Sequence, residues 1–119
     1  MQIIKAAKSR IPLMADESAF DLAQVKALRA ASAADIINIK LMKCGGPSAA
    51  RMIAAIADTH RLALMWGCSD ESRLSIAAAL HTAFACPATR YLDLDGHLDL
   101  ASDPARGGFL LEDGLLRLT

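Results

Sequence analysis

Short apolar runs alternate with helix-length segments along this chain. Within the helix-length segments, apolar residues recur three or four positions apart, which is the spacing of an amphipathic helix. The tail has two short apolar runs on either side of Asp113 and Gly114, a pattern that favours a β-hairpin. The predicted order is therefore βαβαβαβ followed by a β tail, with four buried strands at 11–15, 35–41, 62–66 and 91–94.

Local signals place the starts of the three predicted helices. Ser18, with Asp21 three residues later, has the spacing of a helix start with a hydroxyl cap. Pro47 suits the first turn of the second helix, because its fixed φ is helical and it needs no amide partner there. The third helix is predicted to open within 69–72 and to run to about Phe84.

Each predicted crossover carries a helix, which implies parallel strands with right-handed connections. The strand ends Asp16, Lys40, Cys68 and Asp93 are 24, 28 and 25 positions apart. A (β/α)₈ barrel uses roughly 31 residues for each unit, so four units of this length predict an α/β fold that is half of a TIM-like barrel. The alternative is an open doubly wound sheet, which usually has a glycine-rich phosphate loop after its first strand; no such loop follows 11–15.

Composition narrows the classes of function. The 119 residues are 54% hydrophobic, enough for a large core, and 13 basic residues balance 13 acidic ones to a formal net charge of +0. This balance indicates no nucleic-acid surface and no anionic membrane partner. The three cysteines have no CxxC spacing, which favours a reducing, cytoplasmic location. The longest apolar segment, 76–80, is too short to cross a bilayer.

Polar residues converge at one end of the predicted sheet. Because side chains alternate along a strand, every second residue points to the same face, and three sets of residues can be grouped in this way. If these faces point into a barrel, three carboxylates and an amine meet at its mouth, a group that would suit a divalent cation and a polar substrate. The three sets are Pro12, Met14 and Asp16; Ile36, Asn38 and Lys40; and Tyr91, Asp93 and Asp95.

Each of these groups also has a purely structural interpretation. Asp16 could cap the following helix, and Lys40 could be a salt-bridge partner at a strand end. Asp93 and Asp95 could be turn residues, and Cys68 could be a small apolar filler. From the residues alone, these alternatives remain open.

The segments resemble the C-terminal barrel half of enolase-superfamily enzymes, and among them most closely the dipeptide epimerases of the L-Ala-D/L-Glu epimerase group. PLMADES at 12–18 resembles the fifth-strand motif, and NIKLMKCGG at 38–46 resembles the sixth-strand motif. The resemblance implies that Asp16 is a metal ligand and that Lys40 is one of two acid/base catalysts. Lys43, in the same segment, is predicted to be solvated.

Two further segments carry the resemblance. GCSDESRLSI at 67–76 resembles the seventh-strand motif, although the family often has Met-Glu or Met-Ala-Glu where this chain has Ser-Asp at 69–70. DLDG at 93–96 resembles the Asp-x-Asp pair of the eighth strand, and DPARGGF at 103–109 resembles the closing segment. The resemblance implies that Asp93 and Asp95 bind the α-ammonium group of the substrate, and it places Cys68 beside them as a substrate-binding residue.

The implied activity is that of an isomerase: Mg²⁺-dependent epimerisation of dipeptides such as L-Ala-L-Glu by 1,1-proton transfer. The family's capping domain, its Lys-x-Lys motif on the second strand and its metal ligands on the third and fourth strands have no counterpart in this chain. Residues 1–119 are therefore expected to be a partial barrel domain, containing the fifth to eighth strands and the C-terminal tail.

Two other functions remain open. The first is another enzyme of the superfamily, such as a muconate cycloisomerase or an o-succinylbenzoate synthase. The pair Asp93 and Asp95 argues against it, because those substrates have no ammonium group. The second is an inactive truncated half-barrel or an oligomerising scaffold. A half-barrel leaves strand edges and an apolar face uncovered, so self-association or pairing with a complementary barrel half is expected.

Overall fold

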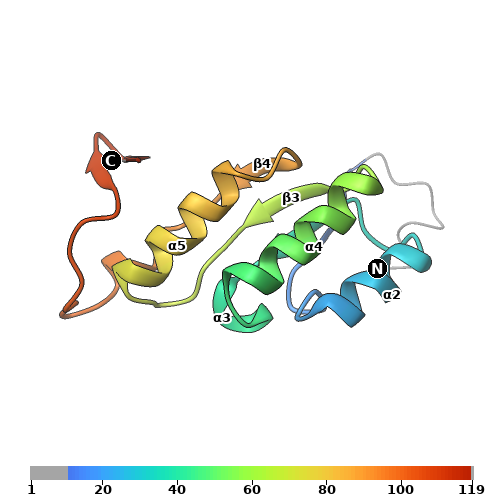
Figure 1. Cartoon of the computed structure of the whole chain (residues 1–119), viewed down its shortest axis with the longest axis horizontal. Coiled ribbons are helices and arrows are strands. Elements are labelled where there is room, and N and C mark those ends of the chain that lie inside the picture. Colours follow the sequence, from blue (N-terminus) through green and yellow to red (C-terminus); the bar gives the residue numbers. More distant parts are fainter. Residues whose placement is uncertain (1–10, 119) are drawn as a thin grey trace.

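The computed structural model describes residues 11–118, and it is an α/β fold built on a four-stranded parallel sheet (Figure 1). The strands lie in the order of the sequence, β1-β2-β3-β4, and each pairs in parallel with the next. Helices α2, α4 and α5 lie side by side along one face of the sheet. The bounds of these elements are β1 (Met14–Ala15), α2 (Leu22–Ala30), β2 (Ile36–Ile39), α4 (Pro47–Thr59), β3 (Ala63–Trp66), α5 (Arg73–Phe84) and β4 (Thr89–Leu92).

The tail is an antiparallel hairpin, as predicted. Strands β5 (Leu110–Glu112) and β6 (Leu115–Arg117) pair with each other around a turn at Asp113 and Gly114. Both turn residues have positive φ, 50° and 76°, which Asp and Gly tolerate well. The turn chemistry alone therefore located this hairpin in the sequence.

The strands differ in extent from the prediction. β1 contains two residues instead of the predicted 11–15, and β4 begins and ends two residues before the predicted 91–94. Pairing with β3 sets the position of β4, and its register shifts between Leu64 and Met65. β2 ends at Ile39 because the chain then turns into α3 (Leu41–Cys44), a one-turn helix that the pattern did not predict.

The helix starts agree with the prediction in two of three cases. Pro47 is the first residue of α4, and Ser72 caps α5, its hydroxyl accepting a hydrogen bond from the Leu74 amide. The prediction that Ser18 caps the first helix was wrong. Asp21 caps α2 instead, its Oδ1 accepting from the Gln24 amide at 2.8 Å. Both residue types can cap a helix, and the turn that closes from the Ala19 amide to the Asp16 carbonyl keeps Ser18 outside the helix.

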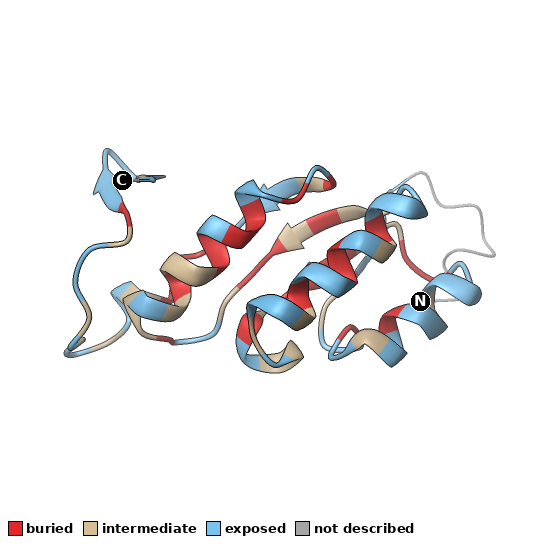
Figure 2. Cartoon of the chain, in the orientation of Figure 1, coloured by how far each residue is buried: buried red, intermediate tan, exposed pale blue. Residues whose placement is uncertain are grey.

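The core lies between the sheet and the three helices. Buried residues line the helix faces turned toward the strands, whereas the outer faces are exposed (Figure 2). Trp66 is fully buried, and its indole N–H donates to Thr89 Oγ1 at 2.9 Å, which ties β3 to β4. Met14 and Tyr91 on the sheet are 40% and 51% exposed, so part of the sheet is uncovered by the described residues. No helix between residues 11 and 118 is long and apolar enough to span a membrane.

Candidate active site

Asp16 and Lys40 meet at the carboxyl ends of β1 and β2. The parallel register pairs Met14 with Ile36, so Asp16 comes level with Asn38 and Lys40 lies just beyond. The Lys40 ammonium is 3.2 Å from Asp16 Oδ1 and 3.4 Å from Oδ2. The prediction that these two residues lie at the same end of neighbouring strands is confirmed. Their contact is the salt bridge of the structural interpretation, and it leaves the catalytic role a prediction.

Lys43 belongs to the same cluster, and the prediction that it is solvated was wrong. Its side chain is 16% exposed, and its ammonium lies 2.5 Å from Glu17 Oε1 and 3.6 Å from Asp16 Oδ1. The one-turn helix α3 is the cause, because it brings Lys43 back over Lys40. Glu17 thus bridges the two lysines, since Lys40 is 3.3 Å from the same Oε1 atom.

This cluster shifts the pKa of two of its members. The ammonium groups of Lys43 and Lys40, in that order of effect, lower the pKa of the Glu17 carboxyl. Burial pulls the pKa of Lys40 down, but its hydrogen bonds to Asp16 and Glu17 outweigh that effect, so its pKa lies above the ordinary value. The two carboxylates therefore favour the ammonium form of Lys40 in this arrangement.

Asn38 is the buried polar residue of this site, and the sequence offered no role for it. It is 5% exposed, and its Nδ2 donates to Asp16 Oδ1 at 3.0 Å. The alternation along β2 placed it on the same face as Lys40. Its contact with Asp16 depends on the β1–β2 register, which the sequence does not give.

A second group forms where β3 and β4 end. The Cys68 thiol lies 3.3 Å from the Asp93 carbonyl and 3.7 Å from Asp95 Oδ1, and it accepts from the Gly96 amide at 3.3 Å. Burial raises the pKa of the Cys68 thiol; the Gly96 N–H opposes this, and the charges of Asp95, Glu71 and Asp93 add to it. Cys68 contacts the loop that carries both aspartates, so a substrate-binding role for its own sulfur stays a prediction.

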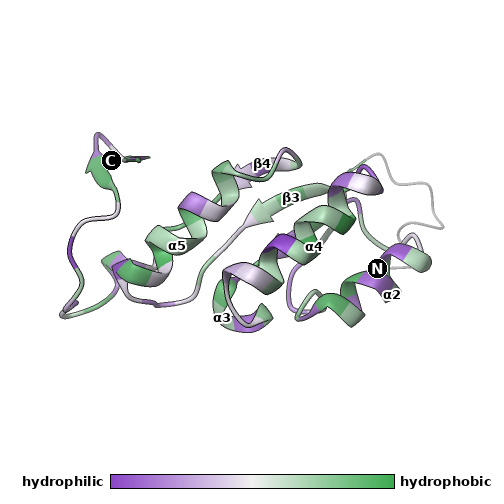
Figure 3. Ribbon diagram, in the orientation of Figure 1, coloured by the Kyte–Doolittle hydropathy of each residue, from purple (hydrophilic) through white to green (hydrophobic). Residues whose placement is uncertain are grey.

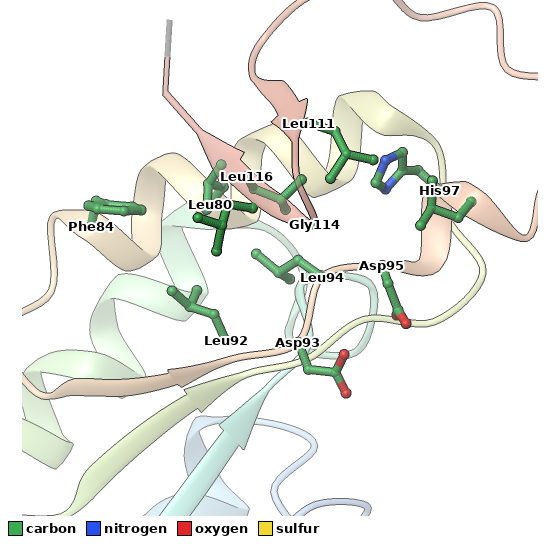
Figure 4. A pocket seen from close by; sticks show the side chains of 12 residues that line it. Leu80, Phe84, Leu92, Asp93, Leu94, Asp95, His97, Leu111, Gly114 and Leu116 are labelled. Atoms are coloured by element: carbon green, nitrogen blue, oxygen red, sulfur yellow. The ribbon is translucent and has the colours of Figure 1, made fainter.

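Asp93 and Asp95 do not share a strand face, contrary to the prediction. β4 ends at Leu92, and Asp95 is the residue that precedes the 3₁₀ turn η1 (Gly96–Leu98). Both residues nevertheless line one pocket of about 420 Å³, and Figure 4 shows their carboxylates pointing away from the leucines of that pocket. The loop therefore presents the two acids together at the edge where Asp16 and Lys40 also lie, because all four strands are parallel.

The residues present fit a magnesium site in chemistry but not in number. Asp16 offers a carboxylate whose side chain is 41% exposed, a ligand type that Mg²⁺ prefers. Within 11–118, however, no three His, Cys, Asp or Glu side chains lie close enough to hold a metal ion. Mg²⁺ needs several oxygen ligands, so Asp16 alone does not make a complete site.

Comparisons with known proteins show which family the sequence matches. The model of the enolase C-terminal domain-like family matches residues 1–119. The chain is 65% identical over 116 residues to an L-Lys-D/L-Arg epimerase of Methylococcus capsulatus, covering 97% of this chain and 32% of that protein. It is 42% identical over 106 residues to an L-Ala-D/L-Glu epimerase of Clostridium acetobutylicum, covering 87% of this chain and 29% of that protein.

Solved structures show the same fold. A dipeptide epimerase of Methylococcus capsulatus, complexed with Mg and the dipeptide L-Arg-D-Lys, superposes with a TM-score of 0.86 at 64% identity, over 97% of this chain and 32% of that one. A substrate-liganded L-Ala-D/L-Glu epimerase of Bacillus subtilis gives 0.87 at 36% identity, over 93% and 31%.

The chain spans about a third of the length of these relatives. The predicted fold class, four parallel βα units from the C-terminal part of a TIM-like barrel, is confirmed. The whole-length match to the family model, the parallel sheet and the placement of Asp16 and Lys40 lead to one conclusion. This chain belongs to the enolase C-terminal domain-like family.

Proposed function

We propose that this chain is the C-terminal barrel part of a Mg²⁺-dependent dipeptide epimerase, an isomerase. The observation that carries the proposal is the contact between Lys40 and Asp16, 3.2 Å apart at the carboxyl edge of the sheet. In parallel α/β folds this edge is where catalytic residues gather. The proposal is supported by the similarity to named epimerases whose structures hold Mg and dipeptides.

The proposed chemistry is a 1,1-proton transfer at the α-carbon of one residue of the dipeptide. Lys40 gives or takes the proton at its Nζ on one face, and Asp16 is one ligand of the metal. Bound Mg²⁺ would supply a positive charge that stabilises the carboxylate side of the substrate as the α-proton leaves. The opposite face needs a second acid/base group, which the described residues do not supply.

Asp93 and Asp95 are proposed to bind the ammonium end of the dipeptide. Charge-assisted hydrogen bonds of this kind weaken sharply when the carboxylate is neutralised. The same pair disfavours the alternative enzymes of the superfamily, a muconate cycloisomerase or an o-succinylbenzoate synthase, because their substrates lack an ammonium group.

The electrostatics of the loops favour a cationic dipeptide over L-Ala-L-Glu. Four exposed aspartates follow β3 and β4, and none is in an ion pair with another described residue; they are Asp70, Asp93, Asp95 and Asp99. Unbalanced negative charge attracts cationic ligands. The higher identity to the L-Lys-D/L-Arg epimerase than to the L-Ala-D/L-Glu epimerase supports the same choice.

Proton exchange at the α-carbon tests this function. The chain is incubated in D₂O with Mg²⁺ and either L-Lys-L-Arg or L-Ala-L-Glu, and the α-proton signal is followed by NMR. We expect Mg²⁺-dependent exchange, faster for L-Lys-L-Arg, that falls by about 100-fold or more in Lys40→Ala. Lys26→Ala, which removes an exposed lysine of α2, is the matched control and should exchange normally.

Two outcomes would overturn parts of this proposal. Exchange that survives in Lys40→Ala would remove Lys40 from the catalytic role. A chain without any exchange would support the second alternative, an inactive half-barrel or scaffold, at least when it acts alone.

We also propose that the chain self-associates or pairs with a complementary barrel half. The outer edge of β4 has no partner strand among residues 11–118. Helix α5 is apolar over much of its surface (Figure 3), and Leu74 and Phe84 on it are 72% and 62% exposed. Exposed edges and apolar surface favour pairing with another chain. A monodisperse monomer in light scattering would contradict self-association.

A further inference from the structure

We propose that Asn38 is a positioning residue that orients the Asp16 carboxylate, and that Gly67 exists without a side chain to give Asn38 the space to do so. The catalytic part of this proposal rests on the proposed function, whereas the orientation of Asp16 by Asn38 does not depend on that function. Asn38 lies on β2, and Gly67 directly follows the neighbouring strand β3. The hydrogen bonds of Lys40 Nζ go to Asp16 and Glu17 and not to either of these residues.

The contact with Asp16 is specific. Asn38 Nδ2 lies 3.0 Å from Asp16 Oδ1, and Asn38 is 5% exposed, so the donor of this hydrogen bond is shielded from solvent. Asp16 itself is the more exposed partner, with 41% of its side chain accessible. Asn38 is therefore the buried donor to this carboxylate, whose other contacts are the ammonium groups of the two long side chains Lys40 and Lys43.

Gly67 follows β3 and faces the Asn38 amide. A Cβ at position 67 would lie 2.8 Å from Asn38 Oδ1 and 2.9 Å from Nδ2, closer than such atoms approach each other. Gly67 is held in this place, because its amide donates to the Ile39 carbonyl at 3.0 Å. Any side chain here would displace the amide of Asn38 and hence its bond to Asp16.

Packing alone does not account for an asparagine at this position. The Asn38 amide oxygen is buried and accepts no hydrogen bond from the described residues. A buried acceptor without a donor destabilises a fold, whereas an apolar residue of similar shape avoids the loss. A leucine at position 38 would fill the same space without an unpaired acceptor. The hydrogen bond from the amide nitrogen to Asp16 explains why an asparagine is present here.

The arrangement separates two tasks. Lys40 contacts Asp16 Oδ1 and Oδ2, at 3.2 and 3.4 Å, but it must move its ammonium toward a substrate to transfer a proton. Asn38 holds Oδ1 from the buried side. Asp16 therefore keeps its orientation when Lys40 leaves, and its metal-binding geometry does not depend on the position of the catalytic lysine.

The test is the side-chain conformation of Asp16, read from three-bond NMR couplings that report χ1. We expect a single χ1 rotamer in the unmodified chain and in Lys40→Met, and rotamer averaging in Asn38→Leu. A fixed Asp16 in Asn38→Leu, or averaging in Lys40→Met alone, would overturn the proposal. Ile36→Val, a change on the same strand face, is the matched control and should leave the Asp16 couplings unchanged.

Gly67→Ala keeps the test decisive if Asn38→Leu does not fold. It leaves Asn38 in the chain but places a methyl group against its amide, so it should also release Asp16. Asp16 couplings that are unchanged in a folded Gly67→Ala would contradict the role of Gly67.

Metal affinity and exchange provide the second readout. In a chain that binds Mn²⁺ or catalyses exchange, Asn38→Leu should lower the affinity or kcat by about 10-fold to 100-fold, as the loss of a residue that orients a metal ligand does. KM should change less than kcat. A released Asp16 in a chain without any exchange would confirm the positioning role and count against the proposed function, so the two can fail separately.

Discussion

The Lys40 ammonium contacts both carboxylate oxygens of Asp16 across the β1–β2 pair, at 3.2 and 3.4 Å. Because Lys40 is largely buried, two opposing effects act on its pKa. Burial disfavours the charged form, whereas the carboxylates of Asp16 and Glu17 favour it, and the carboxylates prevail. The pKa of Lys40 thus depends in part on its contact with Asp16.

Asp16→Asn should lower the pKa of Lys40. The substitution removes the nearest negative charge but leaves the burial, so the charged lysine loses support. The ¹³Cε chemical shift of Lys40, followed against pH, measures the change. Asp58→Asn, at the end of α4, is the control and should leave the Lys40 titration in place. An unchanged titration in Asp16→Asn would show that Glu17 alone sets the pKa.

Cys68→Ala should loosen the loop that carries Asp93 and Asp95. The Gly96 amide donates to the Cys68 sulfur at 3.3 Å, and alanine offers no acceptor. We expect hydrogen exchange of the Gly96 amide to accelerate by about threefold to tenfold, the effect of losing one hydrogen bond. Cys68→Ser retains an acceptor and is the control. Equal protection in both variants would mean that the thiol does not hold the loop.

Asp103→Asn should reduce stability at neutral pH and matter less in acid. The Asp103 carboxylate accepts from the Arg73 amide, from the Ala105 amide at 2.9 Å and from the Ser72 hydroxyl at 2.8 Å. The Arg73 N–H is the largest cause that lowers the Asp103 pKa below its ordinary 3.8. A lowered carboxyl pKa contributes stability above pH 3.8, and the contribution is lost as pH falls through the lowered pKa.

Thermal unfolding at several pH values measures this dependence. The midpoint of Asp103→Asn should fall below that of the unmodified chain at pH 7. It should approach that midpoint only as the pH falls below 3.8 and through the lowered pKa, where the Asp103 carboxyl becomes protonated and neutral as well. Asp99→Asn, at an exposed position, is the control. A difference that is the same at all pH values would indicate that the charge of Asp103 has no part in the effect.

Phe109→Ala should destabilise the fold by about 3–5 kcal/mol, the usual loss for a buried aromatic side chain. Phe109 is fully buried, with the Arg73 guanidinium 3.8 Å above its ring and the His97 ring edge-on at 5.1 Å. Urea denaturation measures the loss. Phe84→Ala is the matched control; Phe84 is 62% exposed, and we expect about 0.5 kcal/mol or less there. Equal losses would show that Phe109 does not anchor the tail.

The sequence predicted the parallel sheet well, because buried strands between helices leave a clear pattern of apolar runs. Strand ends were less predictable, since pairing sets them. The first helix start was ambiguous for a different reason: Ser18 and Asp21 both have capping side chains, and the surrounding turn decides between them.

The site was predicted in part. Asp16 and Lys40 were found because a charge that ends a buried strand is unusual, and their meeting followed from parallel strands. Lys43 was misjudged because α3 is a single turn, too short to leave a periodic pattern. Asn38 had no predicted role because its contacts with Asp16 and Gly67 join three different strand ends, and sequence spacing does not show them.

The strands lie in the sheet in the same order as in the sequence, and this has a consequence for folding. Each strand pairs with the next one along the chain, through residues such as Met14 and Ile36, Ile36 and Ala63, or Leu64 and Thr89. No strand pair therefore has to span more than one helical crossover, and the entropic cost of closing a loop rises with the length of that loop. The sheet can grow from one edge as the polypeptide leaves the ribosome, each new strand adding to a template that already exists.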